Sequence, residues 1–135
     1  MKIAVIIVRI LLGLMFVVFG LNAFLHFIPM GEMPTGPAGD FMKALFTSHY
    51  FHVVALSQIL GGLLLLIGFV PLGLVVLGPI LINILSFHIF LQPKGIQMGI
   101  VASVLALFLL WAYRSAFAAL VTTKITQPAS PIVNP

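Results

Sequence analysis

Two long apolar runs joined by a very short turn constrain the fold of this chain more than any other feature of its sequence. The runs cover residues 53–70 and 74–91, and Pro71-Leu72-Gly73 separates them. Each run has about the length that an α-helix needs to cross the hydrocarbon core of a bilayer. Because the connection is so short, the two helices must be antiparallel neighbours. We therefore expect a transmembrane helical hairpin.

The composition extends this expectation to the whole chain. Hydrophobic residues make up 62% and charged residues only 6% of the sequence, whereas soluble domains carry about 25% charged residues. Such a chain cannot cover a water-facing surface, so we expect one integral membrane domain. The net charge of +4 is spread thinly, which favours a role in membrane orientation and excludes a nucleic-acid patch.

The pattern of apolar runs and turn residues predicts an all-α, four-helix membrane bundle. The expected spans are residues 3–28, 51–70, 74–91 and 96–120. The first resembles a signal peptide, but Arg9 interrupts it and no clean small-x-small cleavage site follows, so we expect it to be retained. Residues 122–135 contain three prolines and no periodicity, which predicts a disordered cytoplasmic tail.

The connection between the first two spans is expected to contain a short helix at the membrane surface. Residues 29–40 are rich in proline and glycine and predict a loop. Asp40 stands where an N-cap residue would stand, ahead of a helix over residues 41–46. This loop also holds both acids of the chain, Glu32 and Asp40.

The distribution of positive charge predicts the orientation. Four spans place both termini on one side of the membrane. The cations on that side are Lys2, Arg9, Arg114 and Lys124, and those on the other side are Lys43 and Lys94, together with both acids. The positive-inside rule therefore places both termini in the cytoplasm.

Polar side chains gather in the outer half of the predicted spans and come from three different helices. The set comprises Asn22, His26, Gln58, Asn83 and His88. Counted from the turn at Pro71, Gln58 falls between the depths of Asn83 and His88. Polar groups in a membrane are costly unless they face one another, a cavity or a ligand. The cluster therefore predicts a pocket that opens outward.

Three interpretations of this cluster remain open. Amide and imidazole groups suit the two carbonyl oxygens of a quinone, with aromatic walls from Phe24, Phe27, Phe87 and Phe90. Alternatively, the amides hydrogen-bond one another and only hold the helices together. Thirdly, His26 and His88 could ligate a haem or a metal ion, but no carboxylate or thiolate completes a metal site, so we expect no metal.

Two further observations bear on chemistry. Arg9 and Arg114 are the cations within the spans, with no acid near them; they are expected to reach lipid phosphates, or to bind an anion together if they converge. The chain has no cysteine, which excludes disulfide exchange and iron–sulfur ligation. Any redox role would therefore use a bound cofactor or a partner's thiols.

Short motifs in a defined order resemble the DoxX-like family of small four-helix membrane proteins. They are RILLG at residues 9–13, FGLN at 19–22, QILGG at 58–62, PLG at 71–73, PILIN at 79–83, FH at 87–88 and YR at 113–114. The name of the family comes from a subunit associated with an archaeal terminal quinol oxidase. Relatives include thiosulfate:quinone oxidoreductase subunits and partners in oxidative-stress defence. Relatives often carry a glutamate at the position of Gln58.

The resemblance implies a bacterial inner-membrane protein with a link to quinone. The leading hypothesis is a subunit or accessory of membrane electron transfer or oxidative-stress defence, acting beside membrane lipids and another redox subunit. The glutamine at position 58 implies a pocket that keeps its ligand but loses any reaction that needs the acid. The alternative is a non-catalytic scaffold or assembly partner, and a small-solute transporter ranks last because no inverted repeat is apparent. The oligomeric state is left open.

Overall fold

The computed structural model describes residues 1–29 and 31–123, and this part of the chain is helical without strands. Its elements are α1 (Lys2–Leu25), α2 (Gly36–Thr47), α3 (Tyr50–Ile67), α4 (Val70–Phe90), α5 (Ile96–Ala112), α6 (Arg114–Phe117) and the 3₁₀ helix η1 (Ala118–Val121). The expected all-α architecture is confirmed. The expected tail lies outside the described residues from position 124 onward, and so does Lys124.

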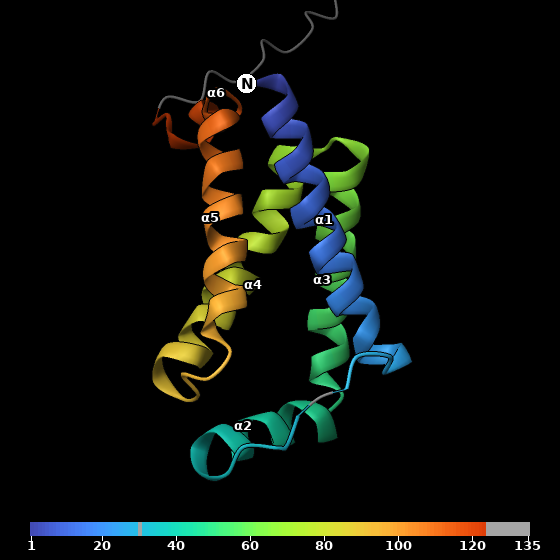
Figure 1. Cartoon of the computed structure of the whole chain (residues 1–135). Coiled ribbons are helices and arrows are strands. Elements are labelled where there is room, and N and C mark those ends of the chain that lie inside the picture. The colour runs from blue at the N-terminus through green and yellow to red at the C-terminus, as the bar shows by residue number, and fades with distance from the viewer. Residues whose placement is uncertain (30, 124–135) are drawn as a thin grey trace, which may run out of the picture.

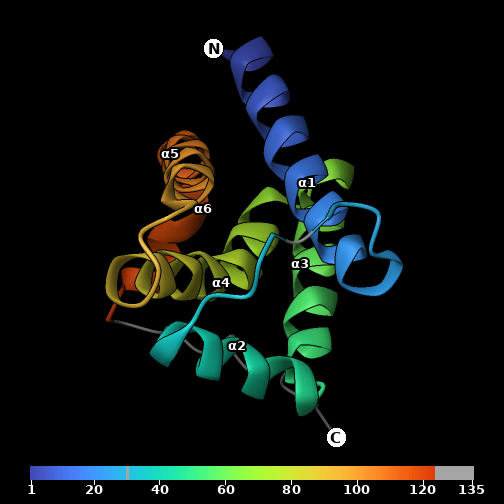
Figure 2. The ribbon, with the colours of Figure 1, turned by 60° about the horizontal axis from the view of Figure 1, so that its bottom comes forward.

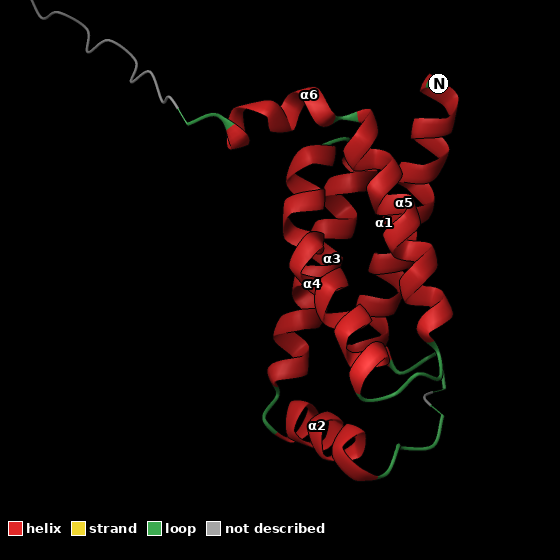
Figure 3. Ribbon diagram, turned by 90° about the vertical axis from the view of Figure 1, so that its left-hand side faces the viewer, coloured by secondary structure: helices red, strands yellow, loops and turns green. Residues whose placement is uncertain are grey.

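Four helices form a ring in which each contacts two neighbours. The packing runs from α1 to α3, α4, α5 and back to α1, with α1 and α3 in the most extensive contact (Figure 1). Helix α2 lies across one end, opposite the N-terminus and α6 (Figures 1 and 3). Helices α1, α3 and α4 are long and apolar enough to cross a membrane, and α5 with the bent segment after it would make a fourth span.

The hydrophobic core lies mainly in the half of the bundle remote from α2. Its fully buried side chains include Leu12 from α1, Leu65 from α3, Leu77 from α4 and Leu109 from α5. Toward α2, the pair α1 and α3 diverges from the pair α4 and α5 (Figure 1; Figure 2 shows α2 in front of this opening). The core therefore fixes one end of the bundle and leaves the other end open to a cavity.

Glycines bring α1 and α3 into backbone contact. A Cβ on Gly62 would lie 2.7 Å from the carbonyl oxygen of Gly13, and one on Gly20 would lie 2.9 Å from that of Ala55. No larger residue fits at either position without moving a helix. Small residues at these positions allow the axes of the two helices to come this close together.

The hairpin turn lies earlier than the sequence indicated. The connection is formed by Gly68 and Phe69, and Pro71 begins α4 instead of ending α3. Gly68 adopts φ 103°, which glycine tolerates, and a proline in the first helical turn loses no hydrogen bond. With about 1.5 Å per residue, Gln58 lies about 14 Å and Asn83 about 20 Å from this turn. The prediction that Gln58 lies at a depth between Asn83 and His88 is therefore wrong.

The helix across the open end begins before the expected position. Helix α2 starts at Gly36 and includes Pro37 in its first turn, so the prediction of a loop through residue 40 is wrong. Thr35 occupies the N-cap position, and Asp40 lies inside the helix with its side chain exposed. Gly39 is buried against the carbonyl group of Pro34, which leaves no room for a Cβ. The proline that signalled a loop is instead the residue that starts a helix.

The expected fourth span, residues 96–120, is not one straight helix. Helix α5 ends at Ala112, and the segment Arg114–Val121 continues at an angle of 78° (Figure 3). The Arg114 side chain donates a hydrogen bond to the Trp111 carbonyl oxygen at 3.0 Å and covers the Trp111 ring. A positively charged side chain close to the last carbonyl groups of a helix stabilises its C-terminal end. The first helix likewise stops at Leu25, three residues before the predicted end.

Candidate functional site

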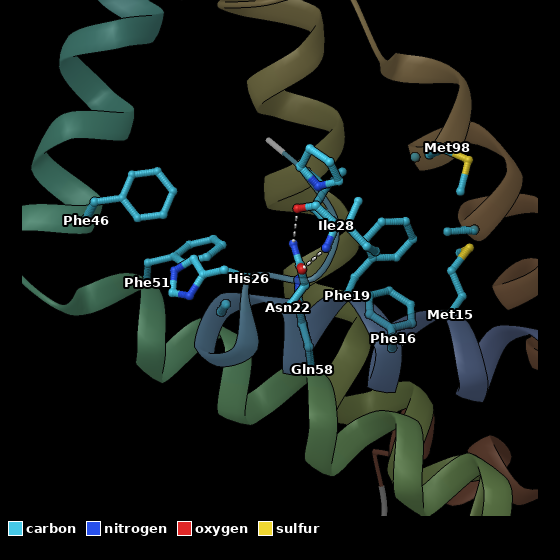
Figure 4. Close-up of a pocket in the computed structure, with 15 residues that line it drawn as sticks. Met15, Phe16, Phe19, Asn22, His26, Ile28, Phe46, Phe51, Gln58 and Met98 are labelled. Atoms are coloured by element: carbon cyan, nitrogen blue, oxygen red, sulfur yellow. Dashed lines mark hydrogen bonds between the residues drawn. The ribbon is translucent and has the colours of Figure 1, made fainter. Parts of the chain in front are cut away.

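A cavity of about 390 Å³ occupies the open end of the bundle, beneath α2. Its walls come from α1, α2, α3, α4 and α5, and most of the lining atoms are carbon (Figure 4). The larger lining side chains are Met15, Phe16, Phe19, Phe46, Phe51, Ile84 and Met98. Three of the predicted site residues also line it: Asn22, His26 and Gln58. A mostly apolar cavity with a few polar groups is typical of a small-molecule site.

Asn22 is engaged with the backbone. Its Nδ2 donates a hydrogen bond to the Ile28 carbonyl oxygen at 3.2 Å, and the Ile28 N–H donates to Oδ1 at 2.7 Å (Figure 4). Between the two residues, His26 takes the left-handed conformation that ends α1. Asn22 therefore shapes the rim of the cavity by folding the chain back after α1. Within the described residues it makes no hydrogen bond to Gln58 or Asn83, the contacts that the packing interpretation expects.

Gln58 carries the free amide of the cavity. The residue is half-buried on α3, close to Gly20 of α1, and its side chain makes no hydrogen bond to any other described residue. An amide offers one acceptor oxygen and two donor hydrogens. Because the neighbouring Asn22 is already paired, Gln58 carries the amide in this cavity that has hydrogen-bonding groups to offer a ligand.

His26 lies at the rim of the cavity. The residue is exposed, and Figure 4 places its ring beside Phe51 of α3. An imidazole at this position can donate or accept a hydrogen bond toward the cavity or exchange a proton with solvent.

Asn83 and His88 do not line the cavity. Asn83 is exposed on the outer face of α4 and makes no hydrogen bond within the part of the chain that is described. His88 lies at the end of α4, where its Nδ1 is 2.8 Å from the Gln92 carbonyl oxygen and its ring contacts Gly95. His88 thus stabilises the turn into α5. The structure does not bring it and His26 to one cavity, as a shared haem or metal would require.

The aromatic walls differ from those expected. Phe24 packs on His52, with ring centroids 5.1 Å apart, and Phe87 packs on Phe41 at 5.7 Å. Phe16 and Phe19 form the wall contributed by α1 instead. The sequence contained a signal for them, because residues 15, 16, 19, 22, 23 and 26 share one helical face at spacings of three and four.

A second group of histidines lies at the start of α3. The rings of His49 and His52 are 5.4 Å apart, and His52 Nδ1 is buried without a hydrogen-bond partner among the described residues. No group of three or more His, Cys, Asp or Glu side chains that could hold a metal ion occurs in residues 1–29 and 31–123.

The two arginines do not form an anion-binding pair. The Arg9 guanidinium lies at the α3–α4 turn beside Gly68, and its Nε is buried without a partner in the described chain. Arg114 instead shares a second cavity, of about 450 Å³, with Lys2. Val5 and Ile6 from α1 and the aromatic residues Trp111 and Tyr113 also line it. The basic residues that line one cavity are therefore Lys2 and Arg114.

Comparisons of the chain with models of protein families, with curated proteins and with solved structures find no match. The resemblance to the DoxX-like family therefore stays a prediction.

Proposed function

We propose that this chain is embedded in a bacterial inner membrane, with α1, α3, α4 and α5 crossing it and both termini in the cytoplasm. The support is the apolar outer surface of the four helices, on which large hydrophobic side chains are exposed along each of them. Helix α5 has 17 residues and would cover about 25 Å. Segment Arg114–Val121 would then lie along the inner surface, and α2 along the outer surface.

We propose that the cavity beneath α2 binds a quinone or a ligand of similar chemistry. The observation that carries this proposal is one unpaired amide, Gln58, in a cavity whose remaining walls are largely apolar. A quinone ring is flat and apolar and bears carbonyl oxygens that accept a hydrogen bond from such an amide. Its isoprenoid tail would leave between the diverging helix pairs into lipid.

The protein would act as a subunit or accessory of membrane electron transfer or oxidative-stress defence. Gln58 cannot take up a proton as a carboxylate would, so the site would hold the ligand while a second redox subunit exchanges electrons with it. His26 at the rim is positioned to exchange protons with the outer side. This agrees with the implication of the family resemblance for a chain with glutamine at this position.

A scaffold role is the second candidate, and the exposed amide of Asn83 favours it. A hydrogen-bonding group on the outside of a membrane helix indicates contact with another chain. In that case the cavity would hold lipid or remain empty, and assembly would be the function.

The two candidates differ in the molecule that co-purifies with the protein. We expect quinone to be enriched over bulk lipid in extracts of the wild-type protein and lost from the Gln58→Leu variant. Ala23→Leu, which fills part of the cavity and leaves Gln58 in the sequence, should also lose it. Asn83→Leu is the matched control and should retain it, because Asn83 lies outside the cavity. Quinone at bulk level in every sample would reject the site, and a Soret band would instead indicate haem.

The same membrane orientation gives a role to the second cavity. Lys2 and Arg114 would contact lipid phosphates at the inner surface, with Trp111 at the level of the headgroups. Arg9 would stabilise the α3–α4 turn instead of reaching lipid, since its guanidinium lies beside Gly68.

A further inference from the structure

Helix α4 presents to the outside of the bundle a face that no other described helix covers. Its exposed side chains include Leu72, Val75, Pro79, Ile82 and Asn83. They recur at spacings of three and four residues and therefore form one stripe along the helix. Ile82 is 68% exposed, and Asn83 beside it is the amide in this stripe. The inward positions, including Leu77 and Ile80, are buried in the core.

The depth of Asn83 makes its exposure costly. Helix α4 runs from Val70 to Phe90, so its midpoint is Ile80. Asn83 then lies about 5 Å from the middle of the helix along its axis. If α4 crosses the membrane as proposed above, this amide faces hydrocarbon. An amide without hydrogen bonds in hydrocarbon is strongly unfavourable, so a partner outside this bundle is required.

We propose that a second copy of this chain supplies that partner, through a parallel α4–α4 contact about a two-fold axis along the membrane normal. A carboxamide carries both donor and acceptor, so Asn83 can pair with Asn83 of the second copy at the same depth. Polar residues of this kind hold transmembrane helices together. When the two Asn83 side chains pair, each amide supplies the donor and the acceptor that the other needs. An apolar partner helix or a lipid chain has no such groups.

A groove along the α5 side of the stripe, where Val75 and Ile82 line it, has room for side chains of a neighbouring helix. This groove of about 360 Å³ runs between α4 and α5 and includes Val75, Gly78, Ile82 and Leu107. Apart from its chain neighbours and the nearby backbone of α4, no described atom lies within 4 Å of the position that a Cβ on Gly78 would occupy. Small residues at a helix surface allow close approach of a second helix. Apolar side chains of the second copy would fill this groove while the amides pair.

This proposal depends on the membrane embedding but not on the quinone site. Asn83 does not line the cavity beneath α2, and none of the cavity residues named above belongs to the exposed stripe. Loss of the dimer and loss of the ligand can therefore be observed separately in one set of variants.

The chain has no cysteine, so single cysteines report on the contact without background. We expect Ile82→Cys, which keeps Asn83, to form a disulfide-linked dimer upon mild oxidation in lipid bilayers. Leu56→Cys is the matched control: it is 58% exposed on α3 and lies at a similar distance from the hairpin turn. It should remain monomeric.

The amide is tested by combining Ile82→Cys with a change at position 83. Asn83→Leu should reduce cross-linking by about tenfold, which corresponds to the strength of a membrane hydrogen-bonded contact. Asn83→Gln keeps the amide and should keep most of the cross-link. The proposal is overturned if Ile82→Cys cross-links no better than Leu56→Cys, or if Asn83→Leu leaves cross-linking unchanged. If quinone is retained in all these samples while cross-linking fails, the dimer is rejected and the proposed quinone site is not affected.

Discussion

Asn22 and Ile28 exchange two hydrogen bonds, one in each direction, between a side-chain amide and the backbone carbonyl oxygen and N–H of Ile28. The backbone after Leu25 no longer makes the hydrogen bonds of an α-helix, because α1 ends there. The Asn22 amide supplies hydrogen bonds to this segment in their place. The returning segment brings Ile28 and Pro29 to the cavity as part of its rim. One side chain on α1 thus shapes the entrance to a site whose free amide comes from α3.

Replacement of Asn22 by Ala should destabilise the protein. The change leaves the Ile28 peptide group without its partner, which costs about 1–3 kcal/mol for a group shielded from water. We expect a lower Tm when unfolding in detergent is followed by circular dichroism. Gln97→Ala is the control, because Gln97 is an exposed amide on α5, and it should stay within about 0.5 kcal/mol of the wild type. Equal melting of both variants would contradict a structural role of the Asn22–Ile28 pair.

A methyl group at Gly62 should separate α1 from α3. The added Cβ would lie 2.7 Å from the Gly13 carbonyl oxygen and 3.0 Å from the Val17 backbone nitrogen, and neither atom can move without its helix. Forcing an extra methyl group into a packed contact costs about 1–3 kcal/mol. Gly31→Ala adds the same group where no described atom lies within 4 Å. A drop in Tm for Gly62→Ala that Gly31→Ala does not share would confirm the close contact.

The turn between α3 and α4 should require glycine at position 68. Its φ of 103° lies where a side chain with a Cβ is strained, at a cost of about 1–2 kcal/mol. The Arg9 guanidinium is also 3.4 Å from the position that a Cβ would take. We expect Gly68→Ala to lower the Tm and Gly68→Asn to lower it less, because asparagine tolerates positive φ. A tolerated alanine would show that the turn has another conformation in the membrane.

Lys2 and Arg114 should bind anionic lipid phosphates together. We expect the variant Lys2→Gln, Arg114→Gln to retain less phosphatidylglycerol than the wild type, as measured by native mass spectrometry from mixed micelles. Lys43→Gln, Lys94→Gln removes the same charge from the α2 side and should change retention little. Added inorganic phosphate should compete if the site recognises the phosphate alone. Similar losses in both double variants would indicate a general charge effect and no defined site.

Several features were predictable because they depend on local properties of the sequence. The helices follow from long apolar runs, and the short connection between the runs at 53–70 and 74–91 predicts that these two helices are antiparallel neighbours. Their ends were less predictable, since a proline can end a helix or begin one. Pro71 and Pro37 both begin helices here. Whether a proline ends or begins a helix depends on the backbone conformation of the residues before it. Here Gly68 ends the preceding helix α3, and Thr35 is the N-cap residue of α2.

The candidate site was only partly predictable, and α4 shows why. Asn22, His26 and Gln58, which were expected in the outer half of the spans, line one cavity. Helix α4 is apolar on all sides, so its sequence contains no amphipathic signal for the face that turns inward. Asn83 was expected inside and lies outside. Its direction is set when Leu77 packs against Gly61.

The sequence by itself determined that this chain forms long apolar helices, where they lie along the chain, and that α3 and α4 are antiparallel neighbours. Only the tertiary structure decided how each helix is rotated, and therefore which polar groups share a cavity and which face outward. The physical reason is that hydrophobicity selects burial for a helix as a whole. The rotation of a uniformly apolar helix is selected by the fit of large side chains against small ones on its neighbours.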